Sequence, residues 1–325
     1  MTKLGYQIPN FTYPGVGPAD LFEAVARQAE AADRSGFDTV LVMDHFYQLP
    51  MLGPPENAML ECYTTLAALA SRTRHVRLGA LVTGNTYRNP ALLAKEVTTL
   101  DIVSRGRAQL GIGAGWFEFE HDALGFEFGT FTDRFEKLEE SLQIILPMLR
   151  DERPTLDGEH YTVKEAINQP PPIGRIPVMI GGSGERKTLR LVAQYADESN
   201  LTCSPDEVPR KLEALAGHCE RLGRDRAEIT VSVQHNVCIG PTHEQAEADA
   251  RRFLAERGID LDTVDDATRQ MLESLIVMGD PDEVGERLAA TLATGVDGLT
   301  CNLAANGHDP ENVELLGETA AKLVG

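Results

Sequence analysis

The chain has 325 residues, of which 42% are hydrophobic and 25% charged, and its formal net charge is −20. This composition excludes an intrinsically disordered or collagen-like chain. The charge is uneven, because residues 241–325 contain 6 basic and 18 acidic side chains. Such a negative field argues against nucleic acid and anionic membranes as partners, since both are bound mainly through clustered Lys and Arg.

Cysteine usage and the absence of targeting patterns predict a cytoplasmic protein. The cysteines are odd in number and form no C-x-x-C pair, so we interpret them as small apolar fillers and not as catalytic groups. They are Cys62, Cys203, Cys219, Cys238 and Cys301. The sequence shows no signal peptide pattern and no apolar run of about 18 residues, so neither export nor membrane spanning is expected.

Short apolar runs alternate with amphipathic stretches along the first half of the chain. The pattern predicts strands at residues 4–8, 37–43, 76–82 and 107–113. Helices are expected between them at residues 18–36, 61–73 and 90–103. After a loop, a long helix is expected over residues 133–150, where apolar side chains recur at helical spacing.

The same alternation continues after a proline-rich stretch at residues 169–174, which cannot be helical and is expected to form a crossing loop. Further strands are predicted at residues 177–180, 198–203, 229–238 and 298–303. The helices expected here cover residues 186–195, 205–222, 282–294 and 310–323, with an acidic helical region at 244–278.

Strands that are apolar along their length and alternate with helices indicate a parallel sheet covered on both faces. Eight such units are the number that closes a barrel. We therefore predict an α/β fold, a single (β/α)8 TIM barrel with insertions spanning residues 1–325, with an open doubly wound sheet as the alternative. In such a barrel the chemistry lies where strands end and the following loops begin.

The predicted second strand ends in Asp44 and His45. An imidazole at that position faces the mouth of the barrel, where it can exchange a proton near neutral pH. The alternative is a capping aspartate beside a half-buried histidine. Small residues after the third strand can mark a close approach of the main chain to a ligand, but we expect an ordinary loop and then a helix that has Pro90 in its first turn.

The fourth strand ends in closely spaced glycines followed by Trp116, the only tryptophan. The spacing lacks the context of a dinucleotide-binding unit, so we interpret the glycines as letting a flat ligand lie against the main chain. Trp116 is then a pocket wall, or else a core residue. Glu120 and His121 are suited to proton transfer, although a solvated loop pair is the simpler interpretation.

The fifth strand leads into residues 181–184, a Gly-Gly-Ser-Gly run that precedes a predicted helix. Main-chain N–H groups at such a position bind anions, with the Ser183 hydroxyl, Arg186 and Lys187 as further donors. The alternative is a tight turn with Ser183 as the helix cap. The sequence has no nucleoside triphosphate P-loop, no metal-ligand spacing and no G-x-S-x-G elbow, so we expect no metal site.

In this order and spacing the segments resemble the luciferase-like monooxygenase superfamily, and more closely its coenzyme F420-dependent oxidoreductases. The resemblance runs from Leu4 to about Leu303. It is carried by the sequences VMDHF at 42–46, VRLGALVT at 76–83, RNP at 88–90, LGIGAGW at 110–116, EHDALG at 120–125 and IGGSG at 180–184.

The resemblance implies a barrel that binds a flavin-type ring across its mouth. A bulge with a non-prolyl cis peptide bond, here at Leu81-Val82, would support the ring, and the glycine loop around Ser183 would hold the cofactor phosphate. The cofactor-binding residues that it implies are Asp44, Leu81, Val82, Thr83, Ala114, Gly115, Gly181, Gly182, Ser183 and Gly184. It also implies a homodimer.

The function expected from this resemblance is hydride transfer between coenzyme F420 and a small, rather apolar substrate. Trp116 stands where the sugar-phosphate dehydrogenases of the family have a proton-donating glutamate, which argues against that activity. We expect His45 to handle the proton, Asp44 to be its polar neighbour and Trp116 to wall the substrate. The alternatives are an FMN-dependent monooxygenase with a partner reductase, a non-catalytic flavin-binding barrel, and a phosphate-binding barrel enzyme without flavin.

Overall fold

The structure is a computed structural model that describes residues 3–324, with the side chains of 268, 273 and 274 left aside. Its main feature is a ten-stranded parallel sheet that curls into a barrel. The strands are β1 (Lys3–Ile8), β2 (Thr39–Val42), β3 (Arg77–Ala80), β4 (Thr83–Gly84), β5 (Leu110–Gly113), β8 (Val178–Gly181), β9 (Glu198–Leu201), β10 (Thr230–Ile239), β11 (Ile276–Gly279) and β12 (Gly298–Asn302).

The strands follow one another around the barrel in the order β3-β2-β1-β12-β10-β9-β8-β5-β4. β1 lies between β12 and β2, with Tyr6 opposite Cys301 on one side and Val40 on the other. The ring closes where Leu78 of β3 pairs with Ala108 and where β4 pairs with β5. The predicted parallel barrel is therefore confirmed, and the open doubly wound sheet is wrong.

The closure between β3 and β5 has few ladder hydrogen bonds but one strongly bonded side chain. Arg107, just before β5, donates its guanidinium hydrogens to the carbonyl oxygens of Val76 and Ala70 at 2.7 and 3.0 Å. It also reaches the hydroxyl and the carbonyl oxygen of Thr73. These bonds tie residues 70–76, which lead into β3, to the start of β5.

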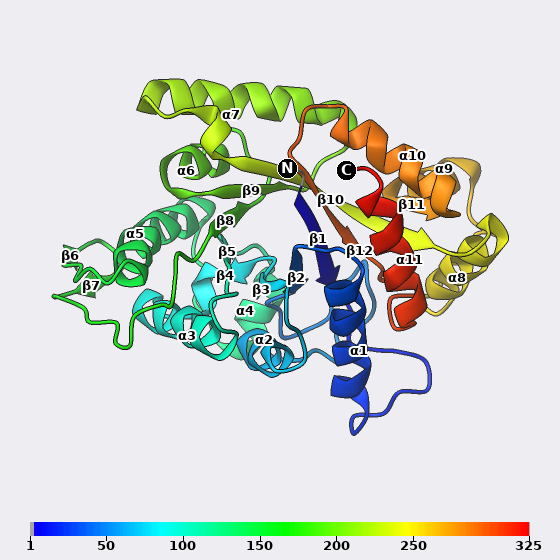
Figure 1. Cartoon of the computed structure of the whole chain (residues 1–325), viewed down its shortest axis with the longest axis horizontal. Coiled ribbons are helices and arrows are strands. Elements are labelled where there is room, and N and C mark those ends of the chain that lie inside the picture. The colour runs from blue at the N-terminus through cyan, green and yellow to red at the C-terminus, as the bar shows by residue number, and fades with distance from the viewer. Residues whose placement is uncertain (1–2, 325) are drawn as a thin grey trace.

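Helices surround the strands, as Figure 1 shows for α1, α2, α3, α5, α6, α7, α10 and α11. The helices are α1 (Leu21–Arg34), α2 (Cys62–Ala70), α3 (Pro90–Val103), α4 (Glu118–Leu124), α5 (Phe131–Leu149), α6 (Thr188–Tyr195), α7 (Val208–Leu222), α8 (His243–Ala255), α9 (Asp266–Leu275), α10 (Pro281–Leu292) and α11 (Pro310–Ala321). Short 3-10 turns lie at Asn85–Tyr87, Pro205–Glu207 and Arg226–Glu228.

The helix positions follow from apolar spacing and from capping side chains. In α5, Leu138, Leu142 and Ile145 fall on one face and are buried, as the spacing predicts. The helix begins with a capping box, in which Thr130 accepts from the amide of Asp133 and Asp133 accepts from the amide of Thr130. The buried face packs on the outer side of the barrel, where the main core lies.

Three elements depart from the sequence prediction. The segment expected to be a loop after β5 contains α4, which ends at Gly125 in the left-handed conformation. The acidic region expected to be helical contains β11, which pairs in parallel with the end of β10. A small antiparallel hairpin of β6 (Leu156–Asp157) and β7 (Thr162–Val163) lies beyond α5.

The cysteines and the helix lengths agree with the composition. Every cysteine is a free thiol, and all but the half-buried Cys203 are buried, so the prediction that they fill the core is confirmed. Among the described residues, no helix is both long enough and apolar enough to cross a membrane.

Candidate active site

Asp44 follows β2 at the carboxyl end of the barrel and is almost completely buried. Arg88 holds both of its carboxylate oxygens, with N–O distances of 2.6 and 2.9 Å, and the amide of Gly84 donates to Oδ2 at 3.0 Å. Burial alone lowers the pKa of Arg88, but Asp44 more than offsets this and leaves the pKa raised. Asp44 therefore fixes the loop after β3 to the end of β2, and its carboxylate is fully engaged.

His45, the next residue, is held by a carboxylate from another loop. Its Nδ1 lies 2.8 Å from Oε2 of Glu120 in α4, and its side chain is 13% exposed. Because a carboxylate only accepts hydrogen bonds, Nδ1 carries the hydrogen and Nε2 is the nitrogen left for a ligand. The structure thus presents an imidazole in one orientation at the carboxyl end of the barrel.

Glu120 is completely buried and accepts four hydrogen bonds. Its Oε2 also accepts from the Tyr87 hydroxyl, and its Oε1 accepts from the amides of Phe46 and Tyr47. Burial raises the pKa of Glu120, but the interactions with His45, Tyr87 and the amide of Tyr47 together outweigh burial, so the pKa lies below its usual value. A buried carboxylate with four donors stays ionised, so Glu120 orients His45 and does not itself supply protons.

His121 beside it has a structural role. Its Nδ1 lies 2.8 Å from the carbonyl oxygen of Phe117, so Nδ1 donates, and its Nε2 accepts from the Thr86 hydroxyl at 2.7 Å. Both ring nitrogens are used and the residue is completely buried. The interpretation of Glu120 and His121 as a solvated loop pair is therefore wrong, because α4 carries both into the interior.

The peptide bond between Leu81 and Val82 is cis, as the family resemblance implied. Val82 lies between two strand-end glycines: an added Cβ would come within 2.8 Å of Val82 at Gly113 and within 2.7 Å at Gly181. The glycines of β5 and β8 therefore make room for this side chain. The Leu81-Val82 segment and the glycine loop after β8, predicted to act together, are neighbours in the structure.

A network of amide side chains fills the barrel below Leu81. Gln7 of β1 donates to the Leu81 carbonyl oxygen at 3.2 Å and accepts from Gln234 at 2.7 Å and from Asn302 at 3.2 Å. Asn302 also donates to Asn236 of β10. These groups come from three adjacent strands, β1, β12 and β10, and through Gln7 they hold the carbonyl group of the bulge in place.

The glycine loop after β8 has free main-chain donors. Gly182 has a positive φ of 116° and its amide donates to the carbonyl oxygen of Asn200, whereas the amides of Ser183 and Gly184 have no acceptor within residues 3–324. The Ser183 hydroxyl accepts from the amide of Thr202, which ties the loop to β9. This arrangement can receive an anion such as phosphate.

Two details of this loop differ from the prediction. The helix begins at Thr188 and not at Arg186, so a turn separates the glycines from its first residue, and Ser183 is not its cap. Arg186 is exposed, and Lys187 lies 3.3 Å from the Thr132 hydroxyl. The anion-binding capacity therefore rests on the loop amides more than on the helix end.

The remaining predicted residues lie around the same mouth. Trp116 is 56% exposed, which excludes the core interpretation, and its ring lies 5.9 Å from that of His45. Ala114 and Gly115 are half-buried, and Gly115 has a positive φ of 82°. Thr83 is completely buried and its hydroxyl pairs with Tyr63, so its side chain holds α2 and does not face a ligand.

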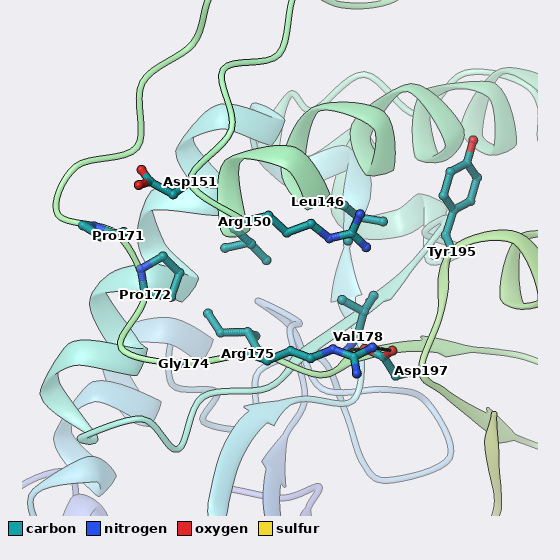
Figure 2. Close-up of a pocket in the computed structure, with 12 residues that line it drawn as sticks. Leu146, Arg150, Asp151, Pro171, Pro172, Gly174, Arg175, Val178, Tyr195 and Asp197 are labelled. Carbon is teal, nitrogen blue, oxygen red and sulfur yellow. Dashed lines mark hydrogen bonds and ion pairs between the residues drawn. The ribbon is translucent and has the colours of Figure 1, made fainter. Parts of the chain in front are cut away.

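A separate groove of about 360 Å³ lies at the other end of the strands (Figure 2). It runs between the end of α5 and the proline-rich loop, beside Val178 at the start of β8. Figure 2 shows Arg150 and Arg175 in it, with Arg175 paired to Asp197. Because active sites of such barrels lie at the carboxyl ends of the strands, this groove is not the candidate active site.

Comparison with known proteins agrees with the geometry. Residues 2–298 match the family model described as luciferase-like monooxygenase. The F420-dependent glucose-6-phosphate dehydrogenase of Microbacterium testaceum is 30% identical over 301 residues, covering 86% of each chain. The enzyme of the same name from Rhodococcus erythropolis is 29% identical and covers 94% of this chain and 93% of its own.

Solved structures show the same fold at lower identity. An F420-dependent secondary alcohol dehydrogenase in complex with an F420-acetone adduct superposes with a TM-score of 0.81 at 19% identity and covers 99% of both chains. The monooxygenase RslO1 from Streptomyces bottropensis gives 0.82 at 18% identity, covering 99% of this chain and all of its own. The barrel, its cis bulge and the matched family model lead to one conclusion: the chain belongs to the luciferase-like monooxygenase family.

Proposed function

We propose that this protein is an oxidoreductase that transfers a hydride between coenzyme F420 and a small, apolar alcohol, carbonyl compound or enone. The observation that carries the proposal is the imidazole of His45, oriented by Glu120 at the mouth of the barrel. The relatives named above, at 30% and 29% identity over most of the chain, are F420-dependent dehydrogenases.

The residues at the mouth fit a phosphate-bearing, ring-shaped cofactor. The unpaired amides of Ser183 and Gly184 suit the phosphate, and Val82 with the neighbouring glycines gives an apolar support for a flat ring. When bound, F420 would supply the site that accepts or releases the hydride. Asp44 contributes by fixing the loop on which this support is built.

The chemistry left to the protein is proton transfer and the exclusion of water. In alcohol oxidation, Nε2 of His45 takes the hydroxyl proton while the hydride leaves the carbon that bears this hydroxyl. In reduction, Nε2 returns the proton to the carbonyl oxygen. Glu120 keeps the ring in the orientation that exposes Nε2 and stabilises its protonated form. Trp116 covers the site and limits water beside His45.

The substrate differs from that of the dehydrogenases named above. Trp116 offers neither charge nor a titratable proton, whereas a sugar phosphate requires polar partners. An aromatic wall next to His45 favours an apolar substrate.

The deciding experiment is a titration of the purified protein with F420 and, separately, with FMN. We expect F420 to bind more tightly and to turn over with apolar alcohols or enones without oxygen. Ser183→Ala keeps the loop amides but removes the hydroxyl hydrogen, which can donate because the oxygen accepts from the amide of Thr202. F420 binding should therefore weaken about 5- to 10-fold, the effect of one lost hydrogen bond of roughly 1–1.5 kcal/mol. Ser71→Ala, at the exposed end of α2, is the matched control. Tight FMN binding with oxygen-dependent turnover would contradict the proposal, and so would binding of either cofactor without turnover.

A further inference from the structure

An apolar groove of about 660 Å³ opens beside the candidate active site. It lies between the loop after β2, the start of α4 and the residues after α8. The apolar part of its lining comes from Pro50, Pro54, Pro55, Phe117 and Phe119. A groove of this volume is large enough for an organic molecule of moderate size.

The groove is connected to His45 through aromatic rings. The Phe117 ring, which lines the groove, has its centroid 5.8 Å from that of His45. Phe119 lies 5.9 Å from Phe117, and Trp116 lies 5.3 Å from Phe117 on the side of His45. Phe117 is 9% exposed, so one largely buried ring separates His45 from the groove.

Several large apolar side chains near the groove are more than half exposed to solvent. Trp116 is 56% exposed and Phe119 is 52% exposed, and Met51, in the loop that forms one wall, is 70% exposed. Contiguous exposed apolar surface beside a catalytic group is typical of a binding site. An apolar ligand that covers these side chains removes their apolar surface from water, which favours binding.

Within the described lining of the groove, one acidic and one basic side chain leave no net charge to attract a phosphate. The charged residues among its described lining are Glu256 and Arg257. The guanidinium of Arg257 donates to the carbonyl oxygens of Leu52 and Phe253, both at 2.6 Å, and it lies 3.3 Å from the Phe253 ring centroid. Arg257 thus serves to hold the wall together, and its charge is partly neutralised by Glu256, whose Oε2 lies 3.7 Å from its Nη1.

We propose that this groove binds the apolar body of the substrate, an uncharged cyclic ketone, alcohol or enone with an alkyl or aryl substituent. The oxygen-bearing carbon lies next to His45 and the substituent extends across Phe117 into the groove. The assignment rests on the proposed function for the reaction at His45, but the binding itself requires no cofactor.

Trp116 makes the binding measurable, because it is the only tryptophan in the chain. The probes are 4-alkylcyclohexanones from methyl to hexyl, titrated into the cofactor-free protein and followed by tryptophan fluorescence and by calorimetry. Each buried methylene contributes about 0.8 kcal/mol, so the Kd should fall about 4-fold per added carbon. Glucose 6-phosphate should not bind in the groove.

Phe119→Ala tests the groove without touching His45. Phe119 is half exposed, so the variant is expected to fold, and the dependence of Kd on chain length should flatten while methylcyclohexanone binding changes little. Ile173→Ala, in the distant proline-rich loop, is the control, because Ile173 is also more than half exposed, and it should keep the full dependence. A Kd that is independent of chain length, or one that Phe119→Ala leaves unchanged, would overturn the proposal.

The two proposals fail in different ways. Binding that depends on chain length, without turnover in the presence of F420, would support the groove and contradict the proposed reaction. Turnover with F420 that does not respond to chain length would support the reaction and overturn the groove.

Discussion

Replacing Glu120 by glutamine removes one negative charge from the candidate active site and changes almost nothing in volume. The glutamine oxygen can still accept from the amides of Phe46 and Tyr47. Its NH2 group, however, comes to face Nδ1 of His45, which the carboxylate holds at 2.8 Å. His45 then has to give up its donor role or rotate away, and either change disturbs Nε2.

The expected loss follows from the kind of bond removed. A hydrogen bond to a charged group contributes about 1.5–3 kcal/mol, which corresponds to roughly 10- to 150-fold in kcat at about 1.4 kcal/mol per factor of ten. KM should change much less, because Glu120 is buried and does not contact a ligand.

The assay is stopped-flow absorbance of F420 under single-turnover conditions, with the thermal midpoint measured in parallel. Tyr87→Phe is the matched variant, because it removes a different hydrogen bond from the same Oε2 atom and leaves the His45 contact in place. It should reduce kcat by a few-fold at most. Equal losses in the two variants, or an unchanged kcat in Glu120→Gln, would refute the orienting role of Glu120.

Two further predictions concern the stability of the barrel. Burial, together with Arg287, lowers the pKa of His235 from 6.5 to about 4, so the unfolded chain binds a proton that the folded one does not between these values. Stability should therefore fall by up to about 3 kcal/mol as the pH drops from 6.5 to 4, and urea denaturation of His235→Phe should show a flatter dependence. Gly181→Ala should cost about 1–3 kcal/mol, because the new Cβ would come within 2.7 Å of Val82. Adding Val82→Ala should recover part of that loss in a double-mutant cycle, and purely additive effects would show that the two residues are not in contact.

Much of the barrel could be predicted from local pattern, because each strand–helix unit carries its own signal. Apolar strand residues and helical spacing located the main strands and the buried face of α5. β11 escaped because its four residues follow α9 without a break, and nothing local marks the change of period. α4 escaped because a seven-residue helix is too short for periodicity to identify it.

The site was predictable where a residue's role follows from its place at a strand end. His45, Trp116 and the glycine loop lie at the mouth as expected. The hydrogen bond between His45 and Glu120 could not be predicted, since the two residues are 75 positions apart and their contact depends on how α4 packs against β2. Asp44 was expected to lie beside His45 and the cofactor, but its carboxylate pairs with Arg88. The sequence could not show this, because Arg88 lies on another loop and only the fold brings the two side chains together. One local feature could have indicated that Glu120 and His121 lie on a helix: Gly125, just after them, is the kind of residue at which helices end.

The hydrogen bonds between Arg107 and the residues before β3 have a consequence for local opening of the barrel. These bonds lie at the amino ends of the strands, close to the bridge between Leu78 and Ala108, while toward the mouth the ring is closed by the short pairing of β4 with β5. Local opening of the ring is therefore expected to start at the mouth and to stop at this guanidinium. Amide hydrogen exchange should then be faster at Gly84 than at Leu78. The edge of the barrel at its mouth could move to admit a ligand while the amino ends of the strands stay closed.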